Sequence, residues 1–105
     1  LVICTYPETT FLEAMHSGVP TVLIYKEEYY ELIPIFEELM IKLKMAGIVF
    51  TDPVEAAKHI NSISSNPEKW WNKEKTEQAK NMFFKFCGIA SHDPLSEWVD
   101  FFKKL

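Results

Sequence analysis

Three short apolar runs alternate with helix-like segments along the chain, and this alternation limits the possible folds more than any other feature. The runs cover residues 1–5, 20–25 and 47–50. Within each run the apolar residues are nearly continuous, whereas a strand with one solvated face would alternate between apolar and polar residues. Continuous apolar strands separated by helices indicate a parallel sheet that is covered on both faces. We therefore predict an α/β fold.

The segments between these runs carry the apolar periodicity of amphipathic helices. One helix is predicted over residues 10–17 and a second over residues 32–46. Each ends at a glycine, Gly18 and Gly47, which is the residue that most often follows the last helical turn. A third helix begins with the Asp-Pro pair at 52–53, because this pair suits a helix cap followed by a first turn.

The resulting order of strands and helices corresponds to half of a doubly wound domain. We predict a three-layer, Rossmann-like half over residues 1–65, with a short parallel sheet of about three strands. Residues 66–105 are rich in aromatic side chains and predict a C-terminal helical tail that packs on this half. The chain leads directly into a strand, without Met or a leader-like segment, so we expect it to be a fragment of a longer protein.

Composition and charge exclude several classes of protein. Apolar residues make up 48% of the chain, which is too many for an intrinsically disordered protein. The formal net charge is -4 and the chain has no Arg, which argues against a domain that reads nucleic-acid bases. No apolar run approaches the roughly 20 residues that a membrane-spanning helix needs. We expect a cytoplasmic protein without a transmembrane segment and without a nucleic-acid partner.

The cysteines and histidines do not predict a metal site. Cys4 and Cys87 lie far apart in the sequence and lack a metal-ligand spacing such as C-x-x-C, so we predict reduced thiols, no metal and no cofactor. His16, His59 and His92 include no pair with the i, i+4 spacing of helical metal ligands. His16 is a candidate general base, but no Ser or Cys nucleophile accompanies it at a recognisable spacing.

The most informative segment covers residues 5–20, at a predicted junction of strand, loop and helix. In open α/β sheets, ligands bind beyond the carboxyl ends of the strands, and a helix start offers free N–H groups that suit phosphate. Thr9 and Thr10 would add two hydroxyls there, and Glu13 could accept hydrogen bonds from ribose. Thr10 and Glu13 also have the spacing of a capping box, and the residues alone leave both interpretations open.

A second candidate is Lys26, which follows the second predicted strand at the same edge of the sheet. Its positive charge could offset that of a phosphate group. Residues 26–31 also contain three acids, which would weaken a phosphate site. The alternative is a solvated loop whose tyrosines pack locally.

The aromatic residues of the tail allow two interpretations. Trp70, Trp71, Trp98 and the phenylalanines within 83–86 could stack on carbohydrate. Their helical spacing favours packing in the core instead. Because the tail holds more aromatic surface than three strands can cover, part of it is also a candidate contact with another domain.

The sequence over residues 9–22, Thr-Thr-Phe-Leu-Glu-Ala-Met-His-Ser-Gly-Val-Pro-Thr-Val, resembles a motif in the C-terminal domain of GT-B glycosyltransferases. More narrowly, the chain resembles the C-terminal end of a little-characterised group of bacterial transferases linked to surface carbohydrates. The features shared with that group are residues 9–13, residues 46–50, and the Trp70-Trp71 pair that precedes a Phe-rich helix.

This resemblance implies that Thr9 and Thr10 meet the diphosphate of a nucleotide-sugar donor, and that Glu13 meets the ribose. The carbohydrate acceptor would then bind through an N-terminal domain outside this chain. Many retaining GT-B enzymes have a second glutamate eight positions before the one equivalent to Glu13, where this chain has Thr5. The stereochemistry of transfer and the catalytic residues therefore stay open.

We predict the donor-binding portion of a sugar transferase, which on its own would catalyse nothing. Two alternatives remain at this stage. One is a sugar-nucleotide epimerase of the same fold, and the other is a non-catalytic α/β interaction module in which Thr10 and Glu13 only cap a helix.

Overall fold

The computed structural model describes residues 1–31, 34–88 and 92–105. Strands and helices alternate through the first two thirds of the chain, and the last third is helical. The strands are β1 (Val2–Cys4), β2 (Thr21–Ile24) and β3 (Val49–Phe50). The helices are α1 (Thr9–Ser17), α2 (Glu37–Met45), α3 (Pro53–Ile63), α4 (Pro67–Trp71), α5 (Glu74–Cys87) and α6 (Pro94–Lys103), with short 3-10 turns η1 (Glu27–Tyr29) and η2 (Pro34–Phe36).

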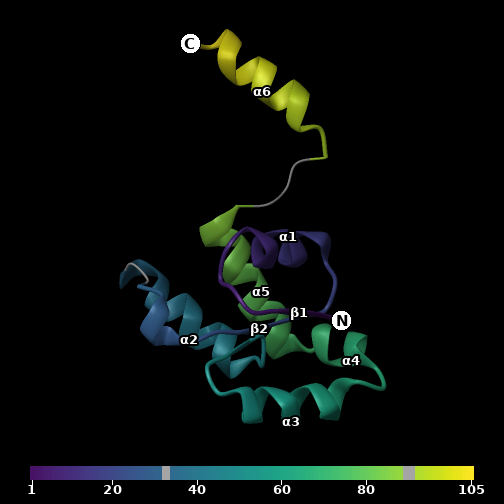
Figure 1. Cartoon of the computed structure of the whole chain (residues 1–105). Coiled ribbons are helices and arrows are strands. Elements are labelled where there is room, and N and C mark those ends of the chain that lie inside the picture. The colour runs from purple at the N-terminus through teal and green to yellow at the C-terminus, as the bar shows by residue number, and fades with distance from the viewer. Residues whose placement is uncertain (32–33, 89–91) are drawn as a thin grey trace.

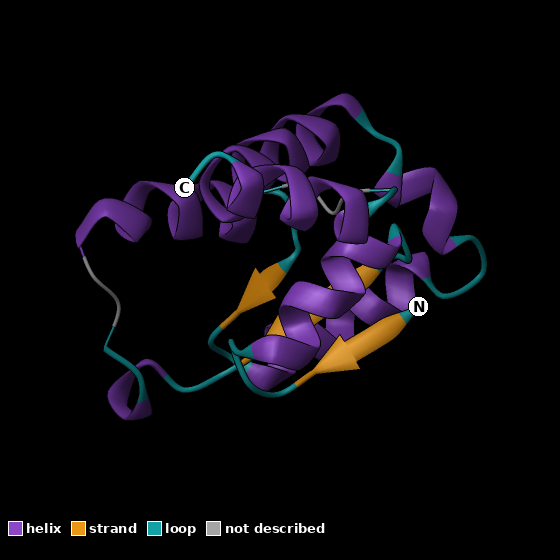
Figure 2. Ribbon diagram, turned by 90° about the horizontal axis from the view of Figure 1, so that it is seen from above, coloured by secondary structure: helices purple, strands orange, loops and turns teal. Residues whose placement is uncertain are grey.

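The three strands form one parallel sheet in the order β1-β2-β3. Ile3 pairs with Val22 and Leu23 pairs with Val49. Val22, Leu23 and Val49 are all buried, as expected for a sheet with helices on both faces. In Figure 1, α1 lies on one side of the sheet and α3 lies on the other, and Figure 2 shows helices over the strands when the molecule is seen from above. The predicted α/β class, with a short parallel sheet and C-terminal helices, is confirmed.

Helix α1 packs one face on the sheet and ends sharply. Phe11, Ala14 and Met15 are its buried residues, and their spacing of three and four places them on one side of the helix. The helix ends at Gly18, which has φ +77° and donates its N–H to the Met15 carbonyl at 3.2 Å. This end agrees with the sequence prediction, and the start lies one residue earlier than predicted.

The start of the second helix differs from the prediction. Residues 32–33, where we placed it, lie outside the described residues. Pro34 begins the 3-10 turn η2, and the α-helix starts only at Glu37. A 3-10 turn has three residues per turn instead of 3.6, so it shifts the apolar stripe. Leu39 and Leu43 are buried, whereas Ile35 from the same predicted stripe is exposed.

The end of α2 is built around Gly47, which has φ +80°. The Gly47 N–H donates to the Lys44 carbonyl at 3.1 Å, and the Ile48 N–H donates to the Leu43 carbonyl at 3.0 Å. These two bonds form a Schellman motif, which pairs the last carbonyls of a helix. Ile48 and Leu43 are both fully buried, so this turn lies in the core and leads directly into β3.

Helices α4 and α5 complete the core. Trp70 and Trp71 of α4 are buried, as are Ala79 and Phe83 of α5. The Trp70 indole donates to the Ala46 carbonyl at 2.9 Å, next to the turn that ends α2. The core packing that we predicted is confirmed for Trp70, Trp71 and Phe83, which belong to the main hydrophobic cluster. It is wrong for Phe86, which is 37% exposed.

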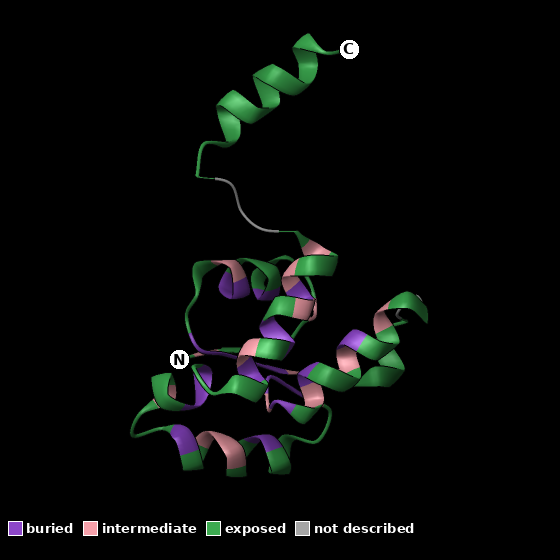
Figure 3. Cartoon of the chain, turned by 180° about the vertical axis from the view of Figure 1, so that it is seen from behind, coloured by how far each residue is buried: buried purple, intermediate pink, exposed green. Residues whose placement is uncertain are grey.

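Helix α6 differs from the other long helices because none of its residues is buried. Figure 3 shows it exposed along its whole length, beyond residues 89–91. Trp98 is 58% exposed, so the core packing predicted for this residue is wrong. Its ring stacks on that of Phe102 at 5.6 Å within the same helix. The division of the chain at residue 65 remains a prediction.

Among the described residues, no helix combines the length and apolar character that crossing a membrane requires.

Candidate functional site

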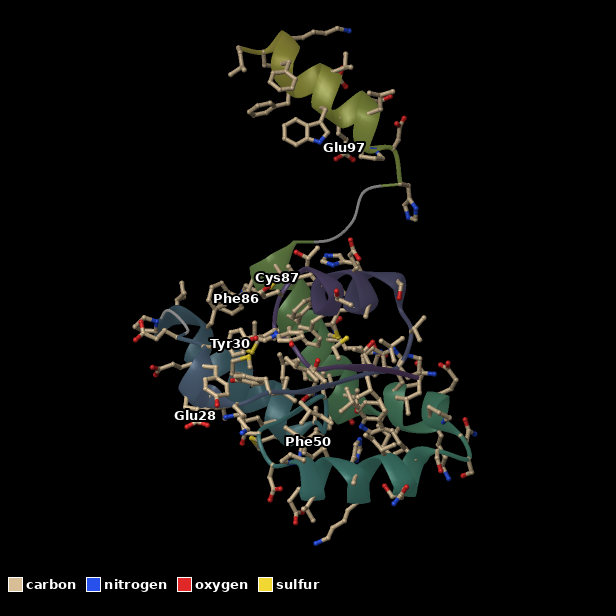
Figure 4. All side chains as sticks on the ribbon, in the orientation of Figure 1. Glu28, Tyr30, Phe50, Phe86, Cys87 and Glu97 are labelled. Carbon is tan, nitrogen blue, oxygen red and sulfur yellow. The ribbon has the colours of Figure 1, made fainter. Side chains whose placement is uncertain are left out.

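A pocket of about 220 Å³ lies where the three strands end, and we call it the edge pocket. Thr5 directly follows the end of β1, Tyr25 follows β2 and Thr51 follows β3. Figures 1 and 4 show this side of the sheet opposite the N-terminus, with Tyr30 beside it. The lining residues are Thr5, Tyr6, Ile24, Tyr25, Lys26, Tyr29, Tyr30, Thr51 and Pro53. The pocket therefore occupies the edge at which parallel α/β sheets bind ligands.

Three tyrosines form a packed cluster around the pocket. Tyr30 meets Tyr25 edge-on with ring centroids 6.0 Å apart, and meets Tyr6 edge-on at 6.5 Å. Tyr25 is 4% exposed, whereas Tyr6 is 63% exposed. The 3-10 turn η1 turns the chain after β2 so that Tyr30 folds back over Tyr25. The cluster gives the pocket one buried aromatic wall and one open aromatic face.

The Tyr25 side chain is 4% exposed, and its hydroxyl is not among the fully buried polar atoms that lack a partner. Burial raises the pKa of Tyr25, an effect that nearby Lys44 opposes and Glu27 reinforces. The phenol is therefore neutral at physiological pH and can donate as well as accept. Burial also raises the pKa of Tyr30, with further contributions from Glu8 and Tyr6.

Lys26 supplies the positive charge among the described lining residues. Its Nζ lies 5.6 Å from the centre of the Tyr29 ring, and within the described ranges it forms no ion pair. The neighbouring Glu27 carboxylate is engaged elsewhere, because it forms an ion pair with Lys44 of α2. One of the three acids that we expected to weaken an anion site near Lys26 is thus already neutralised.

The other three predicted site residues, Thr9, Thr10 and Glu13, lie on α1, which begins beyond the carboxyl end of β1. All three are exposed. They are not among the lining residues of the edge pocket, so the structure brings only Lys26 of the four into it. Their role in binding a ligand remains a prediction.

The capping-box interpretation of Thr10 and Glu13 is wrong. The helix begins at Thr9 with Glu8 as its N-cap, and no side chain makes the cap hydrogen bond there. Thr10 is therefore the second residue inside the helix, whereas a capping box needs it just before the first turn. The amide groups at the start of α1 are left without a side-chain cap.

Sequence reasoning missed Tyr6, Tyr25 and Thr51 as pocket residues. Each of them follows a strand within two residues, and this position is the signal that could have identified them. The expectation that tyrosines of the loop after β2 pack locally is confirmed for Tyr30, which contacts both Tyr6 and Tyr25.

His16 has a structural role that conflicts with proton transfer. Its Nδ1 lies 2.7 Å from the Leu12 carbonyl oxygen, and its Nε2 lies 2.8 Å from the Gly88 carbonyl oxygen. The ring also contacts Phe84 edge-on at 5.4 Å. Both ring nitrogens thus face carbonyl oxygens, Nδ1 within α1 and Nε2 at the end of α5, which leaves neither free to act as a general base.

The remaining titratable candidates are also engaged in packing. Cys4 and Cys87 are free thiols, and burial raises the pKa of each, which makes them poor nucleophiles. Burial lowers the pKa of His59, and Lys73 lowers it further. Across residues 1–31, 34–88 and 92–105, no group of three His, Cys, Asp or Glu side chains is placed to hold a metal ion.

Comparison with known proteins gives one family. A family model described as LIC12162 family transferase matches residues 1–102, which is nearly the whole chain. No curated protein and no solved structure matches the sequence or the fold.

Proposed function

The chain belongs to the LIC12162 family of transferases, and we propose that it forms the donor-binding portion of a sugar transferase. The donor is a nucleotide sugar, and the reaction moves the sugar from the diphosphate to a carbohydrate acceptor. The residues that bind the acceptor, and any general base, would lie in a part of the protein outside this chain. Because both cysteines are free thiols, we also propose a cytoplasmic location.

The observation that carries this proposal is the edge pocket at the carboxyl ends of all three parallel strands. Ligands of open α/β sheets bind in this position. The described lining residues include a lysine and no carboxylate, which suits a negatively charged ligand. A transferase family and a pocket of this kind together favour a phosphorylated donor.

The diphosphate is proposed to lie at the start of α1. The first amides of a helix point their N–H groups outward, and the helix dipole favours negative charge there. No side chain caps this end of α1, so these amides can meet phosphate oxygens, assisted by the hydroxyls of Thr9 and Thr10. Glu13, one turn further along, would accept hydrogen bonds from the ribose.

This arrangement assists the chemistry by stabilising the leaving group. When the bond between the sugar and the diphosphate breaks, negative charge builds up on the terminal phosphate. Amide N–H groups, hydroxyls and the Lys26 ammonium group would be in place before the reaction and would interact most strongly with that developing charge. The chain therefore contributes to transfer without itself supplying a nucleophile or a base.

The proposal is tested by titrating the ¹⁵N-labelled chain with uridine, guanosine and cytidine diphosphates and recording amide NMR shifts. We expect one of the three to shift the amides of residues 5–13 and of Lys26. Lys26→Met should weaken binding, whereas Lys58→Met should not, because Lys58 is exposed on α3 and pairs with Glu55. Absence of shifts at residues 5–13 with all three nucleotides would count against a donor site and favour a non-catalytic interaction module.

A further inference from the structure

We propose that the edge pocket holds the sugar ring of the donor and selects a sugar that carries an apolar substituent, such as a deoxy or N-acylated sugar. This inference rests on the proposed function, because it assigns a subsite within the same donor site. Three features of the pocket lead to it, namely its size, its position relative to α1 and the chemistry of its lining.

The size of the pocket limits what it can hold. Its volume is about 220 Å³, whereas pockets for drug-sized ligands measure about 300–1,000 Å³. A whole nucleotide sugar therefore does not fit inside it. One ring does, while the rest of the ligand lies outside the pocket.

The position of the pocket selects which ring enters it. Tyr6 lines the pocket and precedes Glu8, the N-cap of α1, by two residues, so the start of α1 adjoins the pocket. Glu13 lies about 5–6 Å further along the helix axis than the first turn, at 1.5 Å per residue. With the ribose at Glu13 and the diphosphate at the start of α1, the group on the other side of the diphosphate reaches the pocket. That group is the transferred sugar.

The lining of the pocket favours an apolar substituent. Tyrosine rings together with Ile24 and Pro53 form most of its wall, and the described lining residues include no carboxylate and no side-chain amide. A fully hydroxylated sugar would give up its hydrogen bonds to water and recover few of them here. A methyl or acetyl group would instead bury apolar surface against the rings.

One polar group in this wall is suited to a single sugar oxygen. Tyr25 is 96% buried, since only 4% of its surface is exposed, and it lines the pocket. Its hydroxyl still reaches the surface, because His59 Nε2 is the one fully buried side-chain polar atom without a hydrogen-bond partner among the described residues. A ligand oxygen in the pocket can therefore exchange a hydrogen bond with this phenol.

The test compares three ligands that share one base, chosen as the nucleoside diphosphate that shifts the amides of the chain. They are the diphosphate itself, its fully hydroxylated hexose and the matched deoxy or N-acetyl hexose; GDP-mannose against GDP-6-deoxymannose and UDP-glucose against UDP-N-acetylglucosamine are such pairs. Calorimetric titration of the whole chain should show the apolar-substituted sugar binding roughly fourfold more tightly, as expected for one buried methyl group. Equal or tighter binding of the hydroxylated sugar would overturn the proposed selectivity.

Pocket variants separate this inference from the function on which it rests. Tyr6→Ala and Tyr25→Phe should weaken the nucleotide sugar roughly threefold to tenfold and leave the nucleoside diphosphate unchanged. Phe102→Ala is the matched control, since Phe102 is 60% exposed on α6. Tyr6 is also exposed, so Tyr6→Ala is expected to fold.

Two outcomes would refute the inference in different ways. An equal loss for the diphosphate and the nucleotide sugar would place the nucleotide in the pocket, which overturns the sugar subsite and leaves the donor site standing. Failure of the unmodified chain to bind any of these ligands would overturn the donor site, and the sugar subsite with it.

Discussion

Replacing Gly47 with alanine is expected to destabilise the fold more than the same change at Gly18. Both glycines have positive φ, +80° at Gly47 and +77° at Gly18. An alanine in this left-handed region costs about 1–2 kcal/mol at either position. The two positions differ in the space around an added Cβ. Comparing the two variants therefore separates the energetic cost of backbone strain from that of steric overlap.

At Gly18 an added Cβ would meet no heavy atom within 4 Å. At Gly47 it would lie 2.8 Å from Cε1 and 3.0 Å from Nε2 of His59. The His59 ring cannot swing away easily, because it packs between Phe50 and Trp70, with ring centroids 5.3 Å and 4.8 Å away. Overpacking of this kind costs about 1–3 kcal/mol. The expected loss is therefore about 2–5 kcal/mol for Gly47→Ala and about 1–2 kcal/mol for Gly18→Ala.

Urea unfolding followed by far-ultraviolet circular dichroism gives both values by linear extrapolation. The decisive control repeats Gly47→Ala in a His59→Ala background, where the overlap is gone and only the backbone strain should remain. The cost of Gly47→Ala should then fall to that of Gly18→Ala. The steric reasoning fails if the two glycine variants lose the same free energy in the natural background, or if removing His59 gives no relief.

Three further predictions concern an indole, an imidazole and a carboxylate. Trp70→Phe removes an N–H that donates to a backbone carbonyl at 2.9 Å and should lower the free energy of unfolding in urea by about 1–3 kcal/mol. Trp98→Phe on the exposed α6 should lower it by less than about 0.5 kcal/mol. Similar losses for the two variants would contradict a stabilising role of the Trp70 hydrogen bond. Burial, and then Lys73, lower the pKa of His59, so the folded chain keeps this ring neutral while the unfolded chain binds a proton below about pH 6.5. Stability should therefore hold above that pH and decline as the pH falls toward the folded-state pKa, and His59→Phe should flatten this dependence of the urea midpoint. Glu13→Gln should weaken nucleotide binding in the NMR titration with less than about 0.5 kcal/mol of change in stability, and unchanged binding would refute the proposed contact between Glu13 and the ribose.

The sheet and the ends of the first two helices could be predicted because each depends on local sequence. Continuous apolar runs identify buried parallel strands, and the predicted runs at 1–5, 20–25 and 47–50 contain all three strands. The positive φ angles of Gly18 and Gly47 explain why a helix ends at each of them. The start of the second helix was harder to predict, because Pro34 suits the first turn of an α-helix as well as that of a 3-10 helix.

The site and the tail depend on contacts that the sequence pattern does not contain. Lys26 was predicted at the correct edge because it directly follows a strand. The tyrosine cluster was not, since it depends on how η1 folds Tyr30 back over Tyr25. Likewise, periodicity identifies an apolar face on a helix but not what covers it, and for this reason Trp98 was assigned to the core.

The contact between His16 and Gly88 also has a consequence for the rate at which the fold forms and breaks. It joins residues 72 positions apart, whereas the strand pairings join residues 19 and 26 positions apart. Long loops cost more entropy to close than short ones, so we expect the sheet to form first and this contact to form after the folding barrier. Weakening it with His16→Ala would then speed unfolding and leave the folding rate nearly unchanged. The contact at the end of α5 would thus set the unfolding rate of the chain, and with it the lifetime of the folded state, rather than the folding rate.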